Sequence, residues 1–415
     1  MCVFAALIRI AAIFNKKVRL LVKGQSCTFD ILKSKIGPND RVVWFHAASL
    51  GEFEQGRPLM ERLRQTHPEY KILLTFFSPS GYEVRKDYNG ADCVCYLPVD
   101  TWSNARTFVK YAHPEMAFFI KYEFWENFYK SLNNKNIPIY SVSSIFRPTQ
   151  HFFRWYGNAK TLRYVSHFYV QNEESRKLLS GIGIKDNVTV VGDTRFDRVL
   201  DIRHQAKDLP LVEKFVKGEG KKGEDGEHGT SATSYVLVAG SSWQPDEDLI
   251  IPYFNSHPEL KLVIAPHVIS ESHLREIEAK LQRPSLRYTE ATEENVSSAD
   301  CLIINCFGLL SSIYRYAHVA YVGGGFGVGI HNVPEAAVYG VPVMIGPNNK
   351  KFSEAQALLN LGGCLEIDGA QSFNSTLDHL LSDSTFLRER GTVAGEYIER
   401  NAGCTAKIFN DIFGQ

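Results

Sequence analysis

Several features that commonly signal a function are scarce or missing from this chain of 415 residues. The 46 Lys and Arg residues are balanced by 46 Asp and Glu residues, so no global basic field favours a nucleic-acid partner. The eight cysteines are scattered, and the close pair Cys93 and Cys95 has the spacing of neither a zinc site nor a disulfide framework. No Gly-x-Ser-x-Gly elbow is present. These absences argue against a disulfide-rich protein and a serine hydrolase, and free thiols suit a reducing cytosol.

Long apolar runs are also missing, since none approaches the roughly 20 residues that a membrane-spanning helix needs. Residues 1–22 come nearest, but Arg9, Lys16, Lys17 and Arg19 interrupt them. A secretory signal would carry its charges first and end at a small-residue cleavage site. We therefore expect residues 1–24 to form a basic amphipathic segment in a membrane interface. The alternative is a helix that packs on the protein's own core.

Short apolar runs bounded by turn residues alternate with helix-length amphipathic segments through most of the chain. This alternation is typical of βαβ units, which build parallel sheets in α/β proteins. The predicted strands are 42–46, 71–77, 117–121, 138–142, 167–171 and 188–191, followed by 235–239, 261–265, 301–305, 319–322 and 341–345.

The series is interrupted by residues 217–234, which are rich in Gly and charge and nearly free of apolar residues. Such a segment cannot bury a core, so it predicts a flexible loop near a domain junction. We expect two Rossmann-like domains facing a cleft, with ligands outside the carboxyl ends of the strands. The predicted parts are an N-terminal domain over 25–205, a linker and loop over 206–234, a C-terminal domain over 235–395, and a C-terminal helix over 396–415. The sequence leaves open whether this helix crosses back to the N-terminal domain.

The first motif with chemical potential is HAASLGE at residues 46–52, directly after the first predicted strand. Its small residues and Gly51 indicate a tight turn into a helix, which places Glu52 at the carboxyl end of a strand. A carboxylate there can accept the proton of an attacking hydroxyl. The sequence leaves a second interpretation open, in which Glu52 merely complements the helix macrodipole.

The second motif is a glycine-rich turn with five glycines in residues 323–329, after an apolar strand and before a helix. Glycines let backbone amides approach a phosphate at a helix N-terminus. The spacing is not that of a dinucleotide fingerprint. Asn332 and Glu335 lie three residues apart at the start of the helix, where Glu335 can hold ribose hydroxyls.

Aromatic residues are concentrated at 146–156, with Arg147 and Arg154 between them. This run predicts either a patch that meets an acidic lipid acceptor or the membrane, or a partly buried helix with extended Arg side chains.

Several blocks of sequence are similar to the Kdo transferases, where Kdo is the acidic sugar 3-deoxy-D-manno-octulosonic acid. They are HAASLGE, GGGFGVGIHNVPEAA with GVPVMIGPNNKKFSEA behind it, and GEYIERNAG near the end. The HN-x-x-E element alone indicates a broad nucleotide-sugar group, but together with HAASLGE and YEFW at 122–125 it points to this family. The resemblance runs in order over nearly the whole chain. It implies inverting enzymes of the glycosyltransferase-B fold.

The resemblance implies catalytic roles for Glu52, Glu123 and Arg195. Glu52 matches the family's general base, and Glu123 in KYEFWEN matches a second carboxylate near the transition state. Arg195 stands where the family usually has Lys; the charge is kept, but a planar fork replaces a point charge.

A nucleotide site is also implied, with some departures from the family pattern. Leu309 replaces the usual Glu of a Met-Gly-Glu element, so backbone contacts are what carries over there. Pro266-His267 stands where Pro-Arg-His is typical in the family, so one basic residue is missing and His267 must serve in its place. The implied binding residues are Pro266, His267, Phe307, Gly308, Leu309, Gly325, Asn332, Val333, Pro334 and Glu335.

CMP-Kdo as donor and a lipid A precursor (lipid IVA) as acceptor follow from the resemblance, at the cytoplasmic face of the bacterial inner membrane. No cofactor and no metal ion are expected, because a CMP-activated sugar leaves with a single phosphate that amides and one cation can stabilise. The alternatives are another transferase or epimerase of this fold that uses a UDP-sugar, and a non-catalytic sugar-nucleotide-binding scaffold. Retention of Glu52 and Glu123 favours an enzyme.

Overall fold

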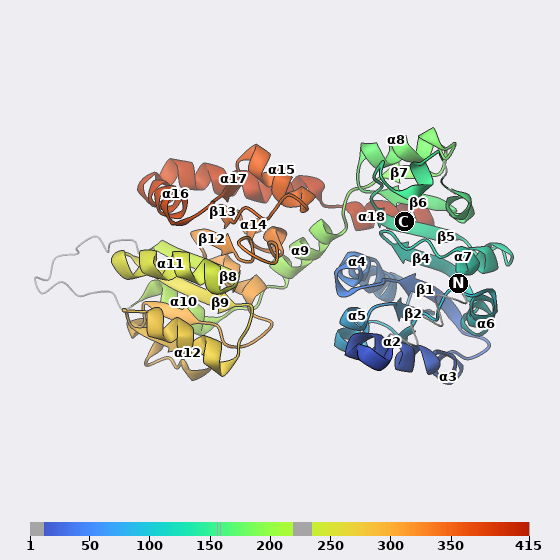
Figure 1. Cartoon of the computed structure of the whole chain (residues 1–415), viewed down its shortest axis with the longest axis horizontal. Helices are drawn as coiled ribbons and strands as arrows, with labels where there is room; N and C mark the ends of the chain where they lie inside the picture. Colours follow the sequence, from blue (N-terminus) through green and yellow to red (C-terminus); the bar gives the residue numbers. More distant parts are fainter. Residues whose placement is uncertain (1–11, 156, 158, 219–234, 415) are drawn as a thin grey trace, which may run out of the picture. The chain divides into compact units, whose positions relative to one another are not determined.

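The computed structural model describes residues 12–155, 157, 159–218 and 235–414. The chain forms two compact units, Met1–Arg198 with Asn401–Gln415, and Val199–Arg400, which we call the N-terminal and C-terminal units. Each unit contains a seven-stranded sheet covered by helices (Figure 1). The predicted α/β class with two such halves is confirmed.

The sheet of the N-terminal unit has the order β3-β2-β1-β4-β5-β6-β7, and its strand pairs are parallel. Its strands are β1 (Arg41–His46), β2 (Tyr70–Phe76), β3 (Cys93–Tyr96), β4 (Pro114–Ile120), β5 (Ile139–Ser144), β6 (His167–Val170) and β7 (Val188–Val190). Its helices are α2 (Lys16–Ser26), α3 (Thr28–Lys35), α4 (Leu50–Thr66), α5 (Pro79–Arg85), α6 (Trp102–Ala112), α7 (Glu126–Asn133), α8 (Glu173–Gly181) and α18 (Cys404–Phe413), and α9 (Arg195–His204) continues into the second unit.

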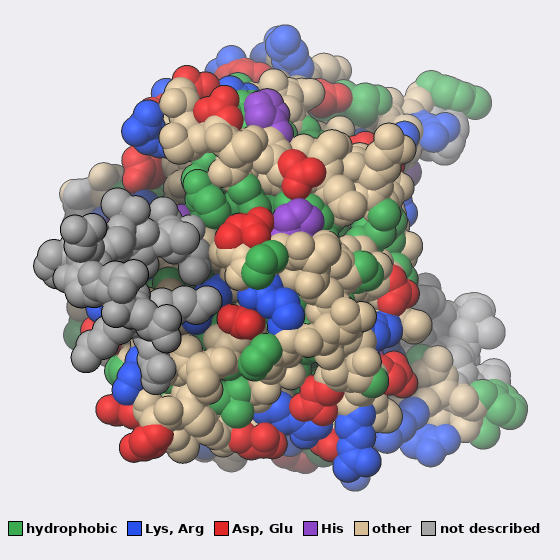
Figure 2. Space-filling model, turned by 90° about the vertical axis from the view of Figure 1, so that its left-hand side faces the viewer, with side chains coloured by type: hydrophobic (Ala, Val, Ile, Leu, Met, Phe, Trp, Pro, Cys, Tyr) green, Lys and Arg blue, Asp and Glu red, His purple; other side chains and the backbone are tan. Residues whose placement is uncertain are grey.

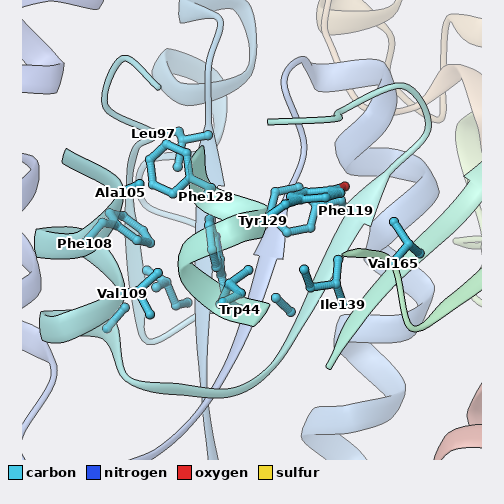
Figure 3. Packing of buried hydrophobic residues seen from close by; sticks show 14 of the residues in the cluster. Trp44, Leu97, Ala105, Phe108, Val109, Phe119, Phe128, Tyr129, Ile139 and Val165 are labelled. Carbon is cyan, nitrogen blue, oxygen red and sulfur yellow. The ribbon is translucent and has the colours of Figure 1, made fainter. Parts of the chain in front are cut away.

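Strand β1 shows why this sheet is buried on both faces. Successive side chains of a strand point to opposite faces, so Trp44 joins one core cluster and Phe45 the other. Trp44 is fully buried, and its ring centroid lies 4.8 Å from that of Phe108 on α6 and 5.8 Å from that of Phe128 on α7 (Figure 3). A sheet apolar on both faces is what parallel strands under two helical layers require.

The C-terminal unit repeats this plan, with the strand order β10-β11-β9-β8-β12-β13-β14 and parallel pairing. Its strands are β8 (Tyr235–Ser242), β9 (Leu260–Pro266), β10 (Ser285–Arg287), β11 (Cys301–Ile303), β12 (Val319–Val322), β13 (Val343–Ile345) and β14 (Cys364–Glu366). Its helices are α10 (Pro210–Lys217), α11 (Gln244–Ser256), α12 (Glu271–Lys280), α13 (Leu310–Ile313), α14 (Val333–Ala337), α15 (Ser353–Leu361), α16 (Ala370–Ser382) and α17 (Ser384–Asn401).

The order of strands creates a switch point in each sheet, where the chain turns from building one side to building the other. In the N-terminal unit this point lies between β1 and β4, and in the C-terminal unit between β8 and β12. Ligands of such sheets bind outside the carboxyl ends of the strands at the switch point. The fold therefore directs attention to the segments that follow these four strands.

Each predicted strand overlaps an observed one, and the predicted helix after HAASLGE is α4. The aromatic run is not a helix: it contains a 3₁₀ turn, η1 (His151–Phe153), because Pro148 cannot continue a helix begun before it. Phe146 is buried, whereas Trp155 is 94% exposed. The range predicted as linker contains α10, whose Val212 and Phe215 are buried.

Two predicted segments fall wholly or partly outside the described residues. The flexible loop is one of them, since residues 219–234 are not described, and the first half of the predicted interfacial segment, residues 1–11, is the other. Within the described residues, no helix combines the length and apolar content that crossing a membrane requires. On the face drawn in Figure 2, acidic and basic side chains are interspersed, in line with the balanced charge of the chain.

Asp197 on α9 ties the C-terminal helix α18 into the N-terminal unit. Its Oδ2 accepts a hydrogen bond from the Thr405 amide at 2.6 Å, and its Oδ1 accepts one from the Gly403 amide. These amides lie in the first turn of α18, where a helix has no internal acceptors for its N–H groups.

We expect Asp197→Ala to destabilise α18 by about 1–3 kcal/mol, the cost of losing a capping carboxylate that also satisfies buried amides. Hydrogen exchange of peptides from residues 404–413 should become faster. Asp186→Ala, at an exposed position, is the matched control. Unchanged exchange in the Asp197 variant would show that the cap is not needed.

Candidate active site

The switch point of the N-terminal sheet brings together the two carboxylates that the sequence singled out. His46 ends β1 and Ile120 ends the neighbouring strand β4, so the segments after them leave the same end of the sheet. Glu52 follows the first strand and Glu123 the second. Their charges interact, because the negative charge of Glu123 raises the pKa of Glu52.

Glu52 lies in the first turn of α4 and is half-buried. Its Oε2 accepts a hydrogen bond from the Ala48 amide at 2.6 Å. Burial first, and then the charge of Glu123, raise the pKa of Glu52 to about 7, against the opposing effect of the Ala48 amide. A carboxylate that served only the helix macrodipole would instead have a lowered pKa, because the helix N-terminus favours its charged form. The geometry thus favours a proton-accepting carboxylate.

Glu123 is held by donors from two sides. Its Oε2 accepts a hydrogen bond from Trp125 Nε1 at 2.8 Å and lies 3.3 Å from His46 Nε2. The Tyr129 hydroxyl donates to the Glu123 carbonyl at 2.7 Å, which fixes the backbone. Lys121 adopts a left-handed conformation with φ of 66°, and it turns the chain sharply after β4. These contacts fix the position of the second carboxylate.

Arg195, the third predicted catalytic residue, is paired with Asp193. The Arg195 Nη2 and Nε atoms lie 2.8 Å and 2.9 Å from Asp193 Oδ2. Asp193 is buried and also accepts from Gln55 Nε2 at 3.0 Å. The guanidinium is therefore held in one orientation, and its charge is partly offset by the aspartate.

The electrostatic environment of Tyr122 links the predicted catalytic residues to Arg147, a residue of the aromatic run. Burial raises the pKa of Tyr122; the positive charges of Arg147 and Arg195 oppose this, and the negative charge of Glu52 adds to it. The charges of these side chains thus all act on one tyrosine. The sequence predicted Glu52, Glu123 and Arg195 as catalytic, but it gave no reason to group Arg147 with them.

In the C-terminal unit, the glycine-rich turn follows β12 and is held by Asp246 of α11. Asp246 is fully buried, and its Oδ2 accepts hydrogen bonds from the Gly324 and Trp243 amides, each at 2.9 Å. Gly324 has φ of 93°, a conformation that favours glycine. A Cβ on Gly325 would lie 2.5 Å from the backbone of Gly346, so close packing also requires glycine there.

The hydrogen bonds of this turn single out the amide of Gly325. The other glycine amides of the turn donate to partners within the unit, namely those of Gly323, Gly324, Gly327 and Gly329. The Gly325 amide has no such partner among the described residues. The sequence predicted phosphate binding by the amides of the turn, whereas four of its five glycine amides donate to groups of the C-terminal unit itself.

Asn332 and Glu335 are brought together as predicted. Asn332 is the N-cap of the short helix α14, and its Nδ2 donates to Glu335 Oε1 at 2.7 Å. The side chains of Val333 and Pro334 are buried in the core of the unit, so these two residues can offer a ligand only their backbone.

His267 belongs to a stack of three rings at the same end of the sheet. Its ring centroid lies 4.6 Å from that of Trp243, which follows β8, and 4.6 Å from that of His331, which follows the glycine-rich turn. The Trp243 indole donates to His331 Nε2 at 3.1 Å. Burial first, and then His267, lower the pKa of His331. The exposed His267 is therefore anchored beside the turn, with Pro266 ending β9 next to it.

The remaining predicted binding residues form the loop before α13. Phe307 is 81% exposed, Gly308 has φ of 86°, and Leu309 is the N-cap of α13. The next residue, Leu310, packs against Gly240 near the end of β8. This loop thus lies near the switch point of the second sheet. Among the described residues there is no group of three or more His, Cys, Asp or Glu side chains that could hold a metal ion.

Comparisons with known proteins bear on both units. Residues 25–198 match the family model of 3-deoxy-D-manno-octulosonic-acid transferase (kdotransferase). The transferase of that name from Aquifex aeolicus is 25% identical over 350 residues, 82% of this chain and 86% of the relative. Its counterpart from Chlamydophila psittaci is 26% identical over 397 residues, 92% of this chain and 85% of the relative.

Among solved structures, UDP-GlcNAc 2-epimerase from Neisseria meningitidis is similar in fold, with a TM-score of 0.61 and 15% sequence identity. The superposition covers 90% of this chain and 100% of the epimerase chain. This likeness shows the fold, and the predicted glycosyltransferase-B architecture is confirmed by such neighbours. The family match and the long sequence alignments add that residues 25–198 match the 3-deoxy-D-manno-octulosonic-acid transferase family and that the chain is similar to such transferases over 82–92% of its length.

Proposed function

We propose that this protein is an inverting, metal-independent glycosyltransferase that moves Kdo from CMP-Kdo to a hydroxyl group of a lipid A precursor. One observation carries the proposal. A half-buried glutamate with its pKa raised to about 7 lies beside a second carboxylate at the switch point of the Kdo transferase domain. A base of this strength is matched to deprotonating a sugar hydroxyl near neutral pH.

In the proposed reaction, Glu52 accepts the proton of the acceptor hydroxyl as its oxygen attacks the anomeric carbon of Kdo. The bond from that carbon to the phosphate oxygen of CMP breaks, and CMP leaves with the bonding electrons. Attack opposite the leaving group inverts the anomeric configuration. Arg195, oriented by Asp193, supplies positive charge for the departing phosphate.

The C-terminal unit holds the nucleotide in this proposal. The Gly325 amide and the His267 ring are assigned to the phosphate, because one is a free donor and the other can carry a positive charge. Asn332 and Glu335, joined by their hydrogen bond, are assigned to the ribose hydroxyls. The loop of Phe307, Gly308 and Leu309 is assigned to the base through its backbone.

Basic and apolar side chains of the N-terminal unit support the proposed acceptor and location. A lipid A precursor is acidic and membrane-bound, which suits Arg147 near the active site and the exposed Trp155. Tryptophan and basic residues favour the membrane–water interface. The exposed side chains of Ile13 and Phe14 before α2 agree with an interfacial N-terminus. We place the enzyme at the cytoplasmic face of the inner membrane.

Mass spectrometry of products tests this function directly. Purified protein, CMP-Kdo and a tetra-acylated lipid A precursor in detergent should give CMP and a lipid heavier by Kdo, with chelator present. Turnover of UDP-sugars but not CMP-Kdo would favour the alternative of another transferase or an epimerase. Tight nucleotide binding without turnover of either donor would favour a scaffold.

Glu52→Gln should lower kcat by about two to four orders of magnitude while leaving CMP affinity unchanged, because it removes the base and keeps the shape. The steady-state rate of CMP release measures this. Glu126→Gln, at an exposed position at the start of α7, is the matched control. A Glu52 variant within threefold of wild type would exclude the assigned role.

Glu335→Ala should weaken CMP binding by about 1–3 kcal/mol, because the ribose hydroxyls and Asn332 lose a charged partner. Isothermal titration calorimetry with CMP and with UMP gives both affinities, and Glu290→Ala in the same unit is the control. Tighter binding of UMP than of CMP by the wild type would contradict the donor assignment.

A further inference from the structure

A line of buried polar groups leads from the interior of the N-terminal sheet to Glu123. Trp44, His46 and Thr75 are each fully buried, although each carries a polar atom. Trp44 Nε1 donates to Thr75 Oγ1 at 2.8 Å, and Thr75 Oγ1 lies 2.8 Å from His46 Nδ1. His46 Nε2 lies 3.3 Å from Glu123 Oε2. Burying three polar groups costs free energy unless each finds a partner, so the line is a satisfied network.

The sheet itself creates this network. His46 on β1 and Thr75 on β2 are partners in the parallel register, so their side chains lie on the same face. Trp44 lies two residues before His46 and therefore points to that face as well. The three side chains are fixed by the strands rather than by a mobile loop. Side chains fixed in this way hold their hydrogen-bond partners in a defined position.

The hydrogen-bond roles determine which nitrogen of His46 carries the proton. Thr75 Oγ1 already accepts from Trp44, and its own proton can go to His46 Nδ1 at 2.8 Å or to the Phe45 carbonyl at 3.3 Å. The shorter contact favours donation to Nδ1. A carboxylate cannot donate, so a neutral imidazole facing Glu123 must present Nε2–H. Thr75 at Nδ1 and Glu123 at Nε2 thus favour the same tautomer of His46, with the proton on Nε2.

We propose that His46, fixed as the Nε2–H tautomer by Thr75 and Trp44, is a positioning residue that fixes the orientation of the Glu123 carboxylate beside Glu52. The inference rests on the proposed function of this carboxylate pair. Trp125 supplies the second donor to the same oxygen of Glu123, at 2.8 Å. Two N–H donors to one oxygen hold a carboxylate in one orientation.

The consequence falls on Glu52. The negative charge of Glu123 raises the pKa of Glu52, and the size of this effect depends on how close the Glu123 carboxylate is held. The other charged groups around the pair are Lys121, which lowers the pKa of Glu52, and the Asp193, Arg195 and Arg147 charges near Tyr122. His46, together with Trp125, thereby keeps this negative charge next to the assigned base.

The tautomer can be observed without any activity. Long-range ¹H–¹⁵N correlation spectra of ¹⁵N-histidine-labelled full-length protein at pH 8 should show His46 with a proton on Nε2 and none on Nδ1. Loss of the signal in His46→Gln assigns it. A proton on Nδ1, alone or together with Nε2, would overturn the inference even if the enzyme is active.

Activity tests the positioning role. His46→Leu removes the N–H donor, so the Glu123 carboxylate should become mobile and its raising effect on the pKa of Glu52 should weaken. The acidic limb of the kcat profile should then move to lower pH, and kcat should fall about ten- to a hundredfold, the cost of a lost hydrogen bond to a charged group. The KM for CMP-Kdo should stay unchanged.

His46→Gln keeps an N–H near the position of Nε2 and should retain most of the wild-type profile. His167→Gln, where Nε2 contacts Thr189 at 2.8 Å on the same sheet, is the matched control and should leave the profile unchanged. An unshifted acidic limb in a folded, active His46→Leu variant would refute the positioning role. Absence of Kdo transfer by the wild type would instead refute the proposed function. The tautomer of His46 would still be tested independently by the NMR measurement.

Discussion

Two like charges share a half-buried space at the carboxyl end of the first sheet, and the chemistry proposed for the protein depends on this constraint. Burial and the charge of Glu123 together raise the pKa of Glu52 to about 7. Like-charged carboxylates stay close only when the surroundings stabilise the charge of one of them. The Trp125 and His46 nitrogens do this for Glu123, while Glu52 has a backbone amide. One carboxylate is thereby held in place, and the other is made basic.

At the switch point of the C-terminal unit, the main constraint is the close approach of backbone segments in the glycine-rich turn. Buried Asp246 draws the Gly324 and Trp243 amides onto one carboxylate oxygen. The turn is therefore shaped by hydrogen bonds within the unit, and the amide of Gly325 has no partner among the described residues. A ring stack anchors His267 next to it. In both units the polar interior of the fold fixes the groups assigned to substrate.

Much of this arrangement could be predicted from the sequence. Apolar runs indicated the strands, because parallel strands are buried on both faces and read as continuous hydrophobic segments. The turn after the first strand predicted the place of Glu52. The contacts between strands could not be predicted, because they depend on the register in which the strands pair. The contact of His46 with Thr75, for example, joins β1 to β2, and no local sequence pattern encodes it. The Asp193–Arg195 pair could be suspected from its spacing, but not its link to Gln55.

Direct titration of Glu52 tests the central claim most closely. In protein labelled with ¹³C at the glutamate side-chain carboxyl, the Glu52 signal, assigned by its absence in Glu52→Gln, can be followed from pH 4 to pH 9. The account predicts a midpoint of about 7. A midpoint near that of an exposed glutamate, about 4.3, would contradict it, because Glu52 would then be too weak a base for the role assigned to it.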